Sequence, residues 1–423
     1  MKYIIVLFGL IICSIANGQN TTKRVLFLGN SYTGVNFLPQ MIADVAISTG
    51  DTLLFDSNMP GGYTLQGHST NSTSLAKIAL GNWNYVVLQE QSQLPSFPTN
   101  QVEEEVFTYA HFLDSIINAK NPCSETVFYM TWGRKNGDAS NCASWPPVCT
   151  YSGMDSLLNL RYRMMADSNN AILSPVGAVW KYIRQNFPLI DLYESDNSHP
   201  SIAGSYAAAC CFYTTLFRKD PTAISFNSSL SITDAANIRA ATKLIVYDSL
   251  MNWHIGEYDP LASFTYNTSN GKQVKFTNSS LNSTNFNWNF GDGVTSENYN
   301  PTHTYLKSGT YTAQLIANKC DISNTTFQTI NITIPLGVNE ITETNNLKIY
   351  PNPVTITLNV KQNLSNKITY KIVSITGQEI LTGIINNSDN QINVSLLSDG
   401  IYFLQLFDNN KSLGQEKFEK STK

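Results

Sequence analysis

The sequence predicts a multidomain protein, with an α/β three-layer domain built on a parallel sheet followed by two all-β sandwich domains. The chain has 423 residues, which is too long for one compact core. From Lys23 to about His254, short apolar runs alternate with longer amphipathic stretches. This alternation is typical of a parallel sheet with helices on both faces. Beyond Asp259 the helical periodicity is lost, and polar and aromatic residues alternate in short runs that indicate β-strands.

Residues 1–18 are predicted to form a secretory signal peptide. Lys2 supplies a positive charge, the apolar run 3–15 follows, and Ala16 and Gly18 provide small residues before a cleavage point. The run is too short for a convincing membrane span, and no other segment is long and apolar enough for one. The mature chain is therefore expected to be soluble and exported.

Residues 19–258 are predicted to form the α/β domain. The expected strands are short and apolar, at 24–28, 52–56, 85–89, 126–131 and 171–174. The expected helices are longer and amphipathic, at 37–48, 72–80, 101–118, 154–167, 176–186 and 201–217. The order of strands and helices is that of a parallel sheet wound from consecutive strand and helix units.

Composition and cysteine spacing exclude several classes of protein. With 27 basic and 31 acidic residues the formal net charge is −4, which is too balanced for a nucleic-acid-binding protein. No cysteine pair has metal-ligand spacing and no His-Glu-x-x-His motif is present, so neither a metal nor a cofactor is expected. Cys142 and Cys149 bracket a proline-containing loop and are plausible disulfide partners, whereas Cys210 and Cys211 are expected to pack as small apolar residues.

The most informative residues are a serine, an aspartate and a histidine. The strand expected at 24–28 ends on Gly29 and delivers Ser31 at its carboxyl end, where open α/β sheets place their ligands. Asp196 and His199 are three residues apart, so one short turn can direct the carboxylate at an imidazole nitrogen. These three residue types are the components of an acyl-transfer triad.

The order Ser…Asp-x-x-His, with Gly-Asn-Ser at residues 29–31 in place of Gly-Asp-Ser, resembles the SGNH (GDSL-like) hydrolases. The resemblance implies a flavodoxin-like fold and a hydrolase that acts on esters. It also implies that Ser31 is the nucleophile, His199 the general base and Asp196 the group that orients the base.

Each of these residues also has a purely structural interpretation. Ser31 could cap a helix, and Asp196 and His199 could serve only as turn and capping residues. Asp191 and Glu194 are rivals for the acid, but the Asp-x-x-His spacing favours Asp196. The combination of all three residues with the family pattern favours catalysis.

Two backbone N–H groups are expected to stabilise the oxyanion. The N–H of Ser31 is one candidate. The segment 60–63, Pro-Gly-Gly-Tyr, resembles the second block of the family, whose glycine donates its N–H. Gly62 is preferred over Gly61 for this role, and an ordinary turn is the alternative interpretation.

The third block departs from the family pattern. After the strand expected at 85–89, the usual Gly-x-Asn-Asp is replaced by Gln-Glu-Gln-Ser at residues 89–92. Aligning the strand ends places Gln91 at the asparagine position, where its NH₂ group is expected to donate to the oxyanion. Gln89 lies on the same face of the strand and is the alternative donor.

A segment with an aromatic and a cationic residue follows the fourth strand and faces the same edge of the sheet. In it, Trp132 is proposed to stack on a sugar ring and Arg134 to hold an anionic group of the substrate. The alternatives are a structural tryptophan and a loop ion pair. The expected substrate is an ester, with acylated polysaccharide as the candidate class.

Residues 259–335 resemble a PKD domain, a small immunoglobulin-like sandwich. The alternating run at 286–293, Phe-Asn-Trp-Asn-Phe-Gly-Asp-Gly, ends in a turn signal, and the segments 300–305 and 309–315 follow, each with a tyrosine. Asp292 beside two glycines is interpreted as a turn residue rather than a calcium ligand.

After a polar linker at 336–345, residues 346–423 resemble the C-terminal sorting domain of the type IX secretion system. The resemblance is carried by Tyr-Pro-Asn-Pro at 350–353 and by the Gly-Ile-Tyr-Phe strand at 400–403. It implies a bacterium of the Bacteroidetes type, the secretion machinery as a partner, and a secreted or surface location. The rival to a secreted esterase is a catalytically inactive surface adhesin or glycan-binding protein.

Overall fold

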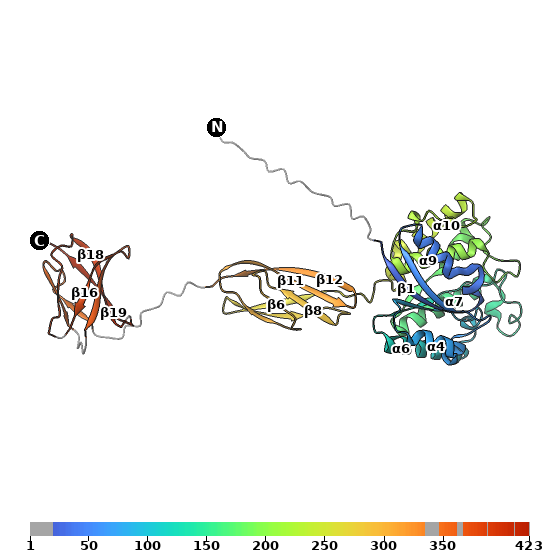
Figure 1. Ribbon diagram of the computed structural model, residues 1–423, viewed down its shortest axis with the longest axis horizontal. Coiled ribbons are helices and arrows are strands. Elements are labelled where there is room, and N and C mark those ends of the chain that lie inside the picture. Colours follow the sequence, from blue (N-terminus) through green and yellow to red (C-terminus); the bar gives the residue numbers. More distant parts are fainter. Residues whose placement is uncertain (1–19, 335–346, 362–366, 387, 410, 423) are drawn as a thin grey trace, which may run out of the picture. The chain divides into compact units, whose positions relative to one another are not determined.

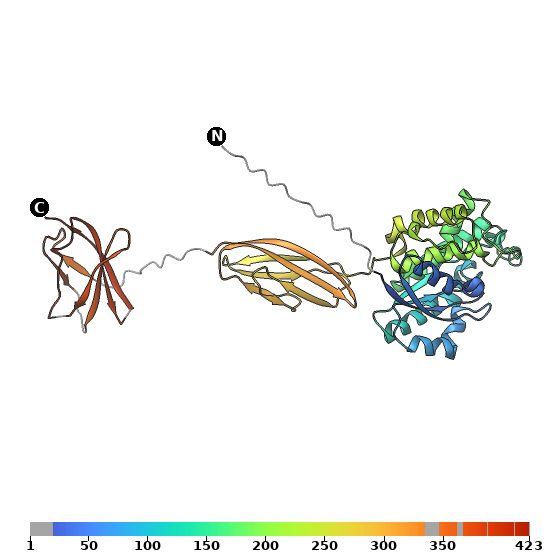
Figure 2. The same ribbon diagram turned by 45° about the horizontal axis from the view of Figure 1, so that its top comes forward.

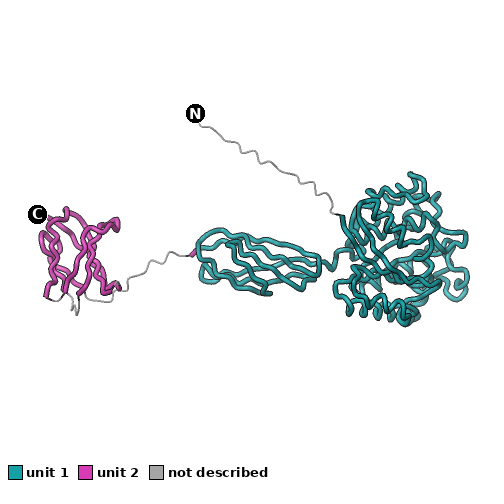
Figure 3. The backbone as a smooth tube through the Cα atoms, viewed as in Figure 1, with its two compact units in different colours: residues 1–333 teal, residues 334–423 magenta. Residues whose placement is uncertain are grey.

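The computed structural model describes residues 20–334, 347–361, 367–386, 388–409 and 411–422. The expected signal peptide and the linker at 336–345 lie outside these ranges. The chain separates into two compact units, residues 1–333 and 334–423 (Figure 3). No helix among the described residues is both long and apolar enough to cross a membrane.

The N-terminal part of the first unit is built on a five-stranded parallel sheet in the order β2-β1-β3-β4-β5 (Figure 1). Its strands are β1 (Thr22–Leu28), β2 (Thr52–Asn58), β3 (Tyr85–Leu88), β4 (Glu125–Tyr129) and β5 (Ile172–Ser174). This order is that of the flavodoxin-like folds. The predicted parallel α/β sheet is therefore confirmed, with all five strands close to their expected positions.

Helices cover both faces of this sheet, as Figures 1 and 2 show. The helices are α1 (Ser31–Gly34), α2 (Leu38–Ile47), α3 (Leu65–Thr70), α4 (Ser72–Ala79), α5 (Thr99–Val102), α6 (Thr108–Lys120), α7 (Tyr151–Asn169), α8 (Val176–Asn186), α9 (Ile202–Phe217) and α10 (Ile232–Ile245). Short helical turns join them: η1 (Val35–Phe37), η2 (Leu94–Ser96), η3 (Glu103–Phe107), η4 (Pro146–Cys149), η5 (Pro221–Ala223) and η6 (Tyr247–Trp253). α2 packs with α9 and α10 packs with α9, whereas α4, α6 and α7 form the other layer.

The burial of these elements follows from their residue types. β1 lies between β2 and β3, and its last four residues are fully buried because helices cover both faces of the sheet. α9 is buried over nearly its whole length, which places Cys210 and Cys211 in the core as expected. Burial raises the pKa of both thiols to about 12.

The register of the sheet places three loop starts at one edge. Leu28 of β1 pairs with Asn58 of β2 and with Leu88 of β3, so these three strands end level. The loops that follow β1, β2 and β3 therefore leave the sheet side by side, at its carboxyl edge. These loops contain the three predicted blocks of the candidate site.

The second domain of unit 1 is a β-sandwich. One sheet has the order β10-β7-β6, and the other has the order β12-β11-β8-β9. The strands are β6 (Phe264–Ser269), β7 (Gln273–Asn278), β8 (Asn285–Asn289), β9 (Thr295–Ser296), β10 (Thr302–Thr304), β11 (Gly309–Lys319) and β12 (Ile322–Ile332). Aromatic side chains fill the space between the sheets, with Phe264, Phe276, Trp288, Phe290 and Tyr305 all buried.

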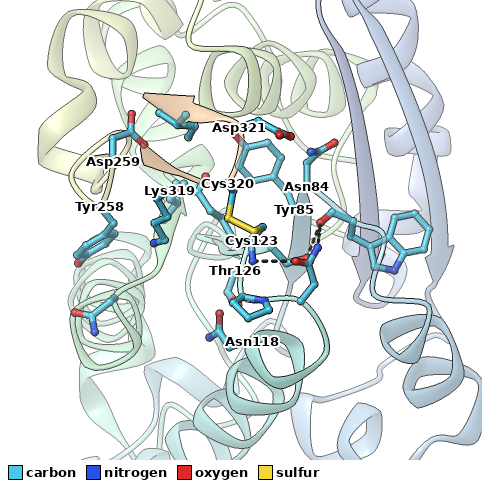
Figure 4. A pocket seen from close by; sticks show the side chains of 18 of the residues that line it. Asn84, Tyr85, Asn118, Cys123, Thr126, Tyr258, Asp259, Lys319, Cys320 and Asp321 are labelled. Carbon is cyan, nitrogen blue, oxygen red and sulfur yellow. Dashed lines mark hydrogen bonds between the residues drawn. A yellow bond between two sulfur atoms is a disulfide. The ribbon is translucent and has the colours of Figure 1, made fainter. Parts of the chain in front are cut away.

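A disulfide between Cys123 and Cys320 joins the sandwich to the α/β domain. Cys320 lies at the turn between β11 and β12, and Cys123 lies in the loop before β4. Beside the disulfide is a cavity of about 270 Å³, at the amino ends of β3 and β4, lined by residues of both domains (Figure 4). Arg218 closes one side of this junction by pairing with Asp259 and, at 3.7 Å, with Glu125.

The second unit contains two antiparallel sheets of its own. Their orders are β13-β14-β17 and β16-β15-β18-β19. The strands are β13 (Lys348–Tyr350), β14 (Thr357–Lys361), β15 (Ile368–Ser374), β16 (Glu379–Ile385), β17 (Gln391–Asn393), β18 (Gly400–Asp408) and β19 (Lys411–Lys420). A separate apolar core that includes Leu358, Ile372, Leu404 and Phe418 holds the two sheets together.

Candidate active site

Ser31 stands at the first position of α1, directly after β1 ends. Asn30 caps this short helix, because its side chain accepts the N–H of Tyr32 at 3.0 Å. The side-chain NH₂ of Asn30 also donates to the carbonyl of Tyr63 at 2.8 Å. The asparagine that replaces the family's aspartate therefore fixes the turn from which Ser31 projects.

The structure brings Ser31, His199 and Asp196 together. The Nε2 atom of His199 lies 2.8 Å from Ser31 Oγ, and its Nδ1 atom lies 2.5 Å from Asp196 Oδ2. A carboxylate can only accept, so Nδ1 carries the proton and Nε2 of a neutral ring accepts from the serine hydroxyl. This is the hydrogen-bond order that a general base needs in order to take a proton from serine.

The carboxylate of Asp196 is held in its charged form. Burial acts to raise its pKa, but hydrogen bonds from the ring of His199 and from two backbone N–H groups outweigh burial and lower it. Those N–H groups belong to Ser198 and His199, each 2.9 Å from Oδ1. One oxygen thus caps the turn while the other orients the imidazole, so the structural and catalytic interpretations of Asp196 coexist.

Neither of the rival acids makes a side-chain hydrogen bond to His199. Both carboxylate oxygens of Asp191 accept from Lys135 Nζ, at 3.0 and 2.8 Å. Glu194 is exposed, and its backbone N–H donates to the carbonyl of His199 at 2.9 Å, across the turn that carries Asp196. Neither side chain therefore competes with Asp196 for His199.

Trp132 is fully buried, with 0 % of its surface exposed. Its ring stacks against Trp180 at 3.6 Å and against Tyr32 at 4.9 Å between ring centres. The expectation that Trp132 stacks on a sugar ring is wrong, because both faces of its indole are covered by aromatic neighbours. Its Nε1–H instead donates to the carbonyl of Ser198 at 3.1 Å, which supports the turn that carries His199.

Arg134 lies beside this site and is a quarter exposed. Its guanidinium lies 3.4 Å from the buried carboxylate of Asp138. The predicted alternative, a loop ion pair, is therefore present. Arg134 also interacts electrostatically with Tyr32, the neighbour of the proposed nucleophile. A role in holding an anionic group stays a prediction.

The predicted oxyanion donors are the backbone N–H groups of Ser31 and Gly62. Among the described residues, neither the N–H of Ser31 nor that of Gly62 has a hydrogen-bond partner. Gly62 has φ +68° in an exposed turn in which the N–H of Tyr63 donates to the carbonyl of Pro60 at 3.3 Å. A side chain rarely adopts that backbone conformation, which explains the glycine.

The third block does not present an amide donor in the expected way. The NH₂ group of Gln91 donates to Gln93 Oε1 at 3.0 Å, and its carbonyl accepts the N–H groups of Gln93 and Leu94. Gln91 therefore caps the turn that leads into η2, and no geometry supports it as an oxyanion donor. Gln89, the alternative donor, is fully buried, and its side-chain oxygen accepts the N–H of Asn30 at 2.9 Å.

Sequence reasoning missed several residues that join the segment of Ser31 to the segment of His199. Asn36 donates to the carbonyl of Pro200 at 3.0 Å and to Ser205 Oγ at 2.9 Å, which ties the loop after the serine to the turn after the histidine. The hydroxyls of Tyr32 and Ser198 lie 2.6 Å apart and make a second tie. Only the left-handed backbone of Asn36, at φ 57°, has a sequence signal, because asparagine tolerates it better than most residues.

The other expected features have clear positions. Cys142 and Cys149 form a disulfide in the loop before α7. Asp292 caps its turn by accepting the N–H of Val294 at 3.1 Å, and it also pairs with His303 at 2.7 Å. Within the described residues, no group of three His, Cys, Asp or Glu side chains is arranged to hold a metal ion.

Comparisons with known proteins agree with this architecture. Residues 259–334 match the model of the PKD domain, and residues 348–418 match that of the secretion system C-terminal sorting domain. Both predicted resemblances are thereby confirmed, and the sorting domain supports secretion or location at the cell surface. No curated protein sequence matches the chain significantly.

Several solved structures resemble the chain. A DUF4886 family protein from Bacteroides uniformis is 16 % identical, with a TM-score of 0.45, covering 54 % of this chain and 95 % of its own. A candidate SGNH hydrolase from Slackia heliotrinireducens is 26 % identical, with a TM-score of 0.37, and covers 45 % and 97 %. The psychrotrophic esterase EstA from a Pseudoalteromonas species is 14 % identical, with a TM-score of 0.33, and covers 46 % and 97 %.

Proposed function

We propose that the protein is a secreted serine esterase that works through an acyl-enzyme. The single observation that supports this most is the continuous series of hydrogen bonds from Ser31 Oγ through His199 to Asp196. A capping serine would need neither contact, and a turn histidine would need only the one with Asp196. Two short hydrogen bonds in the correct tautomeric order are what nucleophilic catalysis requires.

In the proposed reaction, Ser31 Oγ attacks the ester carbonyl carbon while its proton passes to His199 Nε2. Asp196 stabilises the resulting imidazolium. The tetrahedral oxyanion accepts the N–H groups of Ser31 and Gly62. The intermediate then collapses, the C–O bond to the alcohol breaks, and His199 returns the proton to the leaving oxygen. Water, deprotonated by His199, then attacks the acyl carbon. The bond between that carbon and Ser31 Oγ breaks, His199 returns the proton to Oγ, and the acid is released.

We propose an ester carried on a larger molecule, such as an acylated polysaccharide, as the substrate. The exposure of the site supports this class, since the side chains of His199 and Asp196 are 34 % and 48 % exposed. An open site admits an acyl group that projects from a bulky alcohol, whereas a long lipid chain would need an apolar channel. With Trp132 buried, any contact to sugar must come from other residues of this edge.

The test uses the full mature chain with p-nitrophenyl acetate and a fluorophosphonate label. We expect turnover by the native protein, its loss by several orders of magnitude in Ser31→Ala, and a label on Ser31 in mass spectra. Ser156→Ala is the matched control, because that hydroxyl is exposed on α7 and bonds only to the carbonyl of Ser152. Unchanged turnover in Ser31→Ala would refute the mechanism. A native protein without turnover or labelling would favour the inactive adhesin.

A further inference from the structure

Buried side chains form hydrogen bonds between the three loops that leave β1, β2 and β3. None of these buried side chains takes part in the proposed reaction. The first loop carries Ser31 and the second carries Gly62. The third is the Gln-Glu-Gln-Ser segment at 89–92, which departs from the family pattern. Four side chains, those of Asn30, His68, Gln89 and Glu90, make hydrogen bonds from one of these loops or the adjoining helix α3 to the next.

Gln89 joins the third loop to the first. Its side-chain oxygen accepts the N–H of Asn30 and the hydroxyl of Thr33, both at 2.9 Å. A methyl group on Gly29 would lie only 2.8 Å from the same oxygen, so the backbone before Ser31 approaches Gln89 as closely as a glycine allows. Gln89 therefore fixes the height of the serine turn above the sheet.

Glu90 joins the third loop to the second. Its side chain is fully buried, and its Oε2 accepts the N–H of Leu65 at 3.1 Å while its Oε1 accepts the N–H of Gln91 at 2.5 Å. Leu65 is the first residue of α3 and follows Gly62 by three positions. The carboxyl thus restrains the segment that carries the second proposed oxyanion donor.

The second loop returns to the first through two further contacts. His68 on α3 lies with Nε2 at 2.9 Å from the carbonyl of Gly29 and with Nδ1 at 2.7 Å from Ser74 Oγ. Burial lowers the pKa of His68 to about 4, so the ring is neutral and Nε2–H donates to Gly29. With the contact from Asn30 to Tyr63 described above, the three loops form a closed circuit of hydrogen bonds.

Burying a carboxyl group costs free energy, because the group loses its hydrogen bonds to water and needs partners inside the protein. An apolar side chain would fill the same volume without that cost, so the contacts of Glu90 have to be the reason for its presence. What they hold is the position of Gly62 relative to Ser31. Preorganised donors are worth most where they face a developing charge.

We infer that Glu90 is a positioning residue that fixes the Gly62 oxyanion donor through the N–H of Leu65. The inference rests on the proposed function. It means that the altered third block supplies support for two backbone donors instead of the side-chain donor of the family. Gln89 acts in the same way on the first donor, through Asn30.

The test is Glu90→Gln in the full mature chain, with Glu105→Gln as the matched control. Glutamine has nearly the same shape, but it replaces one acceptor oxygen by an NH₂ group that would face the N–H of Leu65 or Gln91. Glu105 is the neighbouring carboxylate on η3, is partly exposed, and bonds only to Gln101, at 3.1 Å. Both variants replace a carboxyl group by an amide of nearly the same shape in the same region.

We expect Glu90→Gln to lower kcat on p-nitrophenyl acetate by roughly 10- to 100-fold, with KM within about twofold, because only the transition state uses the oxyanion donors. The inhibition constant of phenylboronic acid, which forms a tetrahedral adduct with a reactive serine, should rise by a similar factor. Glu105→Gln should change neither quantity by more than about twofold. Amide exchange at Leu65 should accelerate at least about tenfold in Glu90→Gln.

Unchanged kcat and boronate affinity in a folded Glu90→Gln would overturn the inference, even if exchange at Leu65 accelerates, because the bond would then be structural only. Unchanged exchange at Leu65 would overturn it as well. If the native protein has no turnover, the proposed function fails and the exchange measurement alone decides whether Glu90 holds Leu65. If Glu90→Gln does not fold, Glu90→Asp is measured instead, since it keeps the carboxyl group but shortens its reach.

Discussion

Replacing Trp132 by phenylalanine tests whether this tryptophan supports the triad or contacts the substrate. Trp132→Phe keeps a ring between Tyr32 and Trp180 but removes the Nε1–H that donates to the carbonyl of Ser198. The smaller ring leaves a cavity worth roughly 1 kcal/mol. The unpaired carbonyl adds about 1 kcal/mol or somewhat more.

We therefore expect Trp132→Phe to lower the free energy of unfolding by about 2–3 kcal/mol in urea denaturation. The turn that carries His199 loses one of its ties, so kcat on p-nitrophenyl acetate should fall by roughly tenfold, which corresponds to about 1.4 kcal/mol. KM should change little, because no substrate atom touches the buried indole. The effect on kcat should be equal for a small ester and for an acetylated oligosaccharide.

Trp253→Phe is the matched control. Trp253 is also buried, in η6, and its Nε1–H likewise donates to a backbone carbonyl, that of Ile245 at 2.7 Å. This variant should lose comparable stability while keeping kcat. The burial argument is refuted if Trp132→Phe raises KM for the acetylated oligosaccharide alone and leaves stability and kcat unchanged.

Two further predictions concern pH and export. Burial raises the pKa of Glu90 from 4.5 to about 8, so between these pH values the folded state holds a proton that the unfolded state has lost. The free energy of unfolding should therefore fall as pH rises through this window, and Glu90→Gln should remove that part of the slope; an identical slope in both proteins would contradict the raised pKa. Truncation after Asn345 removes a unit with its own core, so activity should persist while the protein no longer reaches the surface or medium of its host. Fractionation of host cells checks this, and normal export of the truncated chain would contradict the sorting role of residues 348–418.

Local patterns were sufficient to predict the α/β sheet and the juxtaposition of Ser31, His199 and Asp196. Apolar runs such as Val86–Leu88 are unambiguous because both faces of a parallel strand are buried. The proposed triad could be identified because an acid and a histidine three residues apart form a local unit, and only Ser31 had to be brought from elsewhere. The end of a central strand is where the topology delivers such a residue.

Features that depend on long-range packing were not predictable. Cys123 and Cys320 are separated by 197 positions and lie in different domains, so no local spacing pairs them. The position of Trp132 after a strand indicated the right edge of the sheet but not its burial, which depends on Trp180 and Tyr32 from distant segments. The predicted helix at 101–118 is interrupted by η3, which is a π-helical turn. No proline or glycine in this segment signals the interruption.

The third block shows why a motif comparison by position was misleading here. Aligning strand ends assumes that each position keeps its task, and on that basis Gln91 replaced the donor asparagine. In the structure, the side chain of Gln91 instead forms hydrogen bonds within the next turn. The side chains of Gln89 and Glu90 accept backbone N–H groups of the two neighbouring loops. Backbone N–H groups can serve an oxyanion whatever side chains surround them, provided that their positions are fixed. An oxyanion hole built from backbone groups therefore needs rigid support more than a third side-chain donor, and that support can come from any buried acceptor that reaches the adjacent loop.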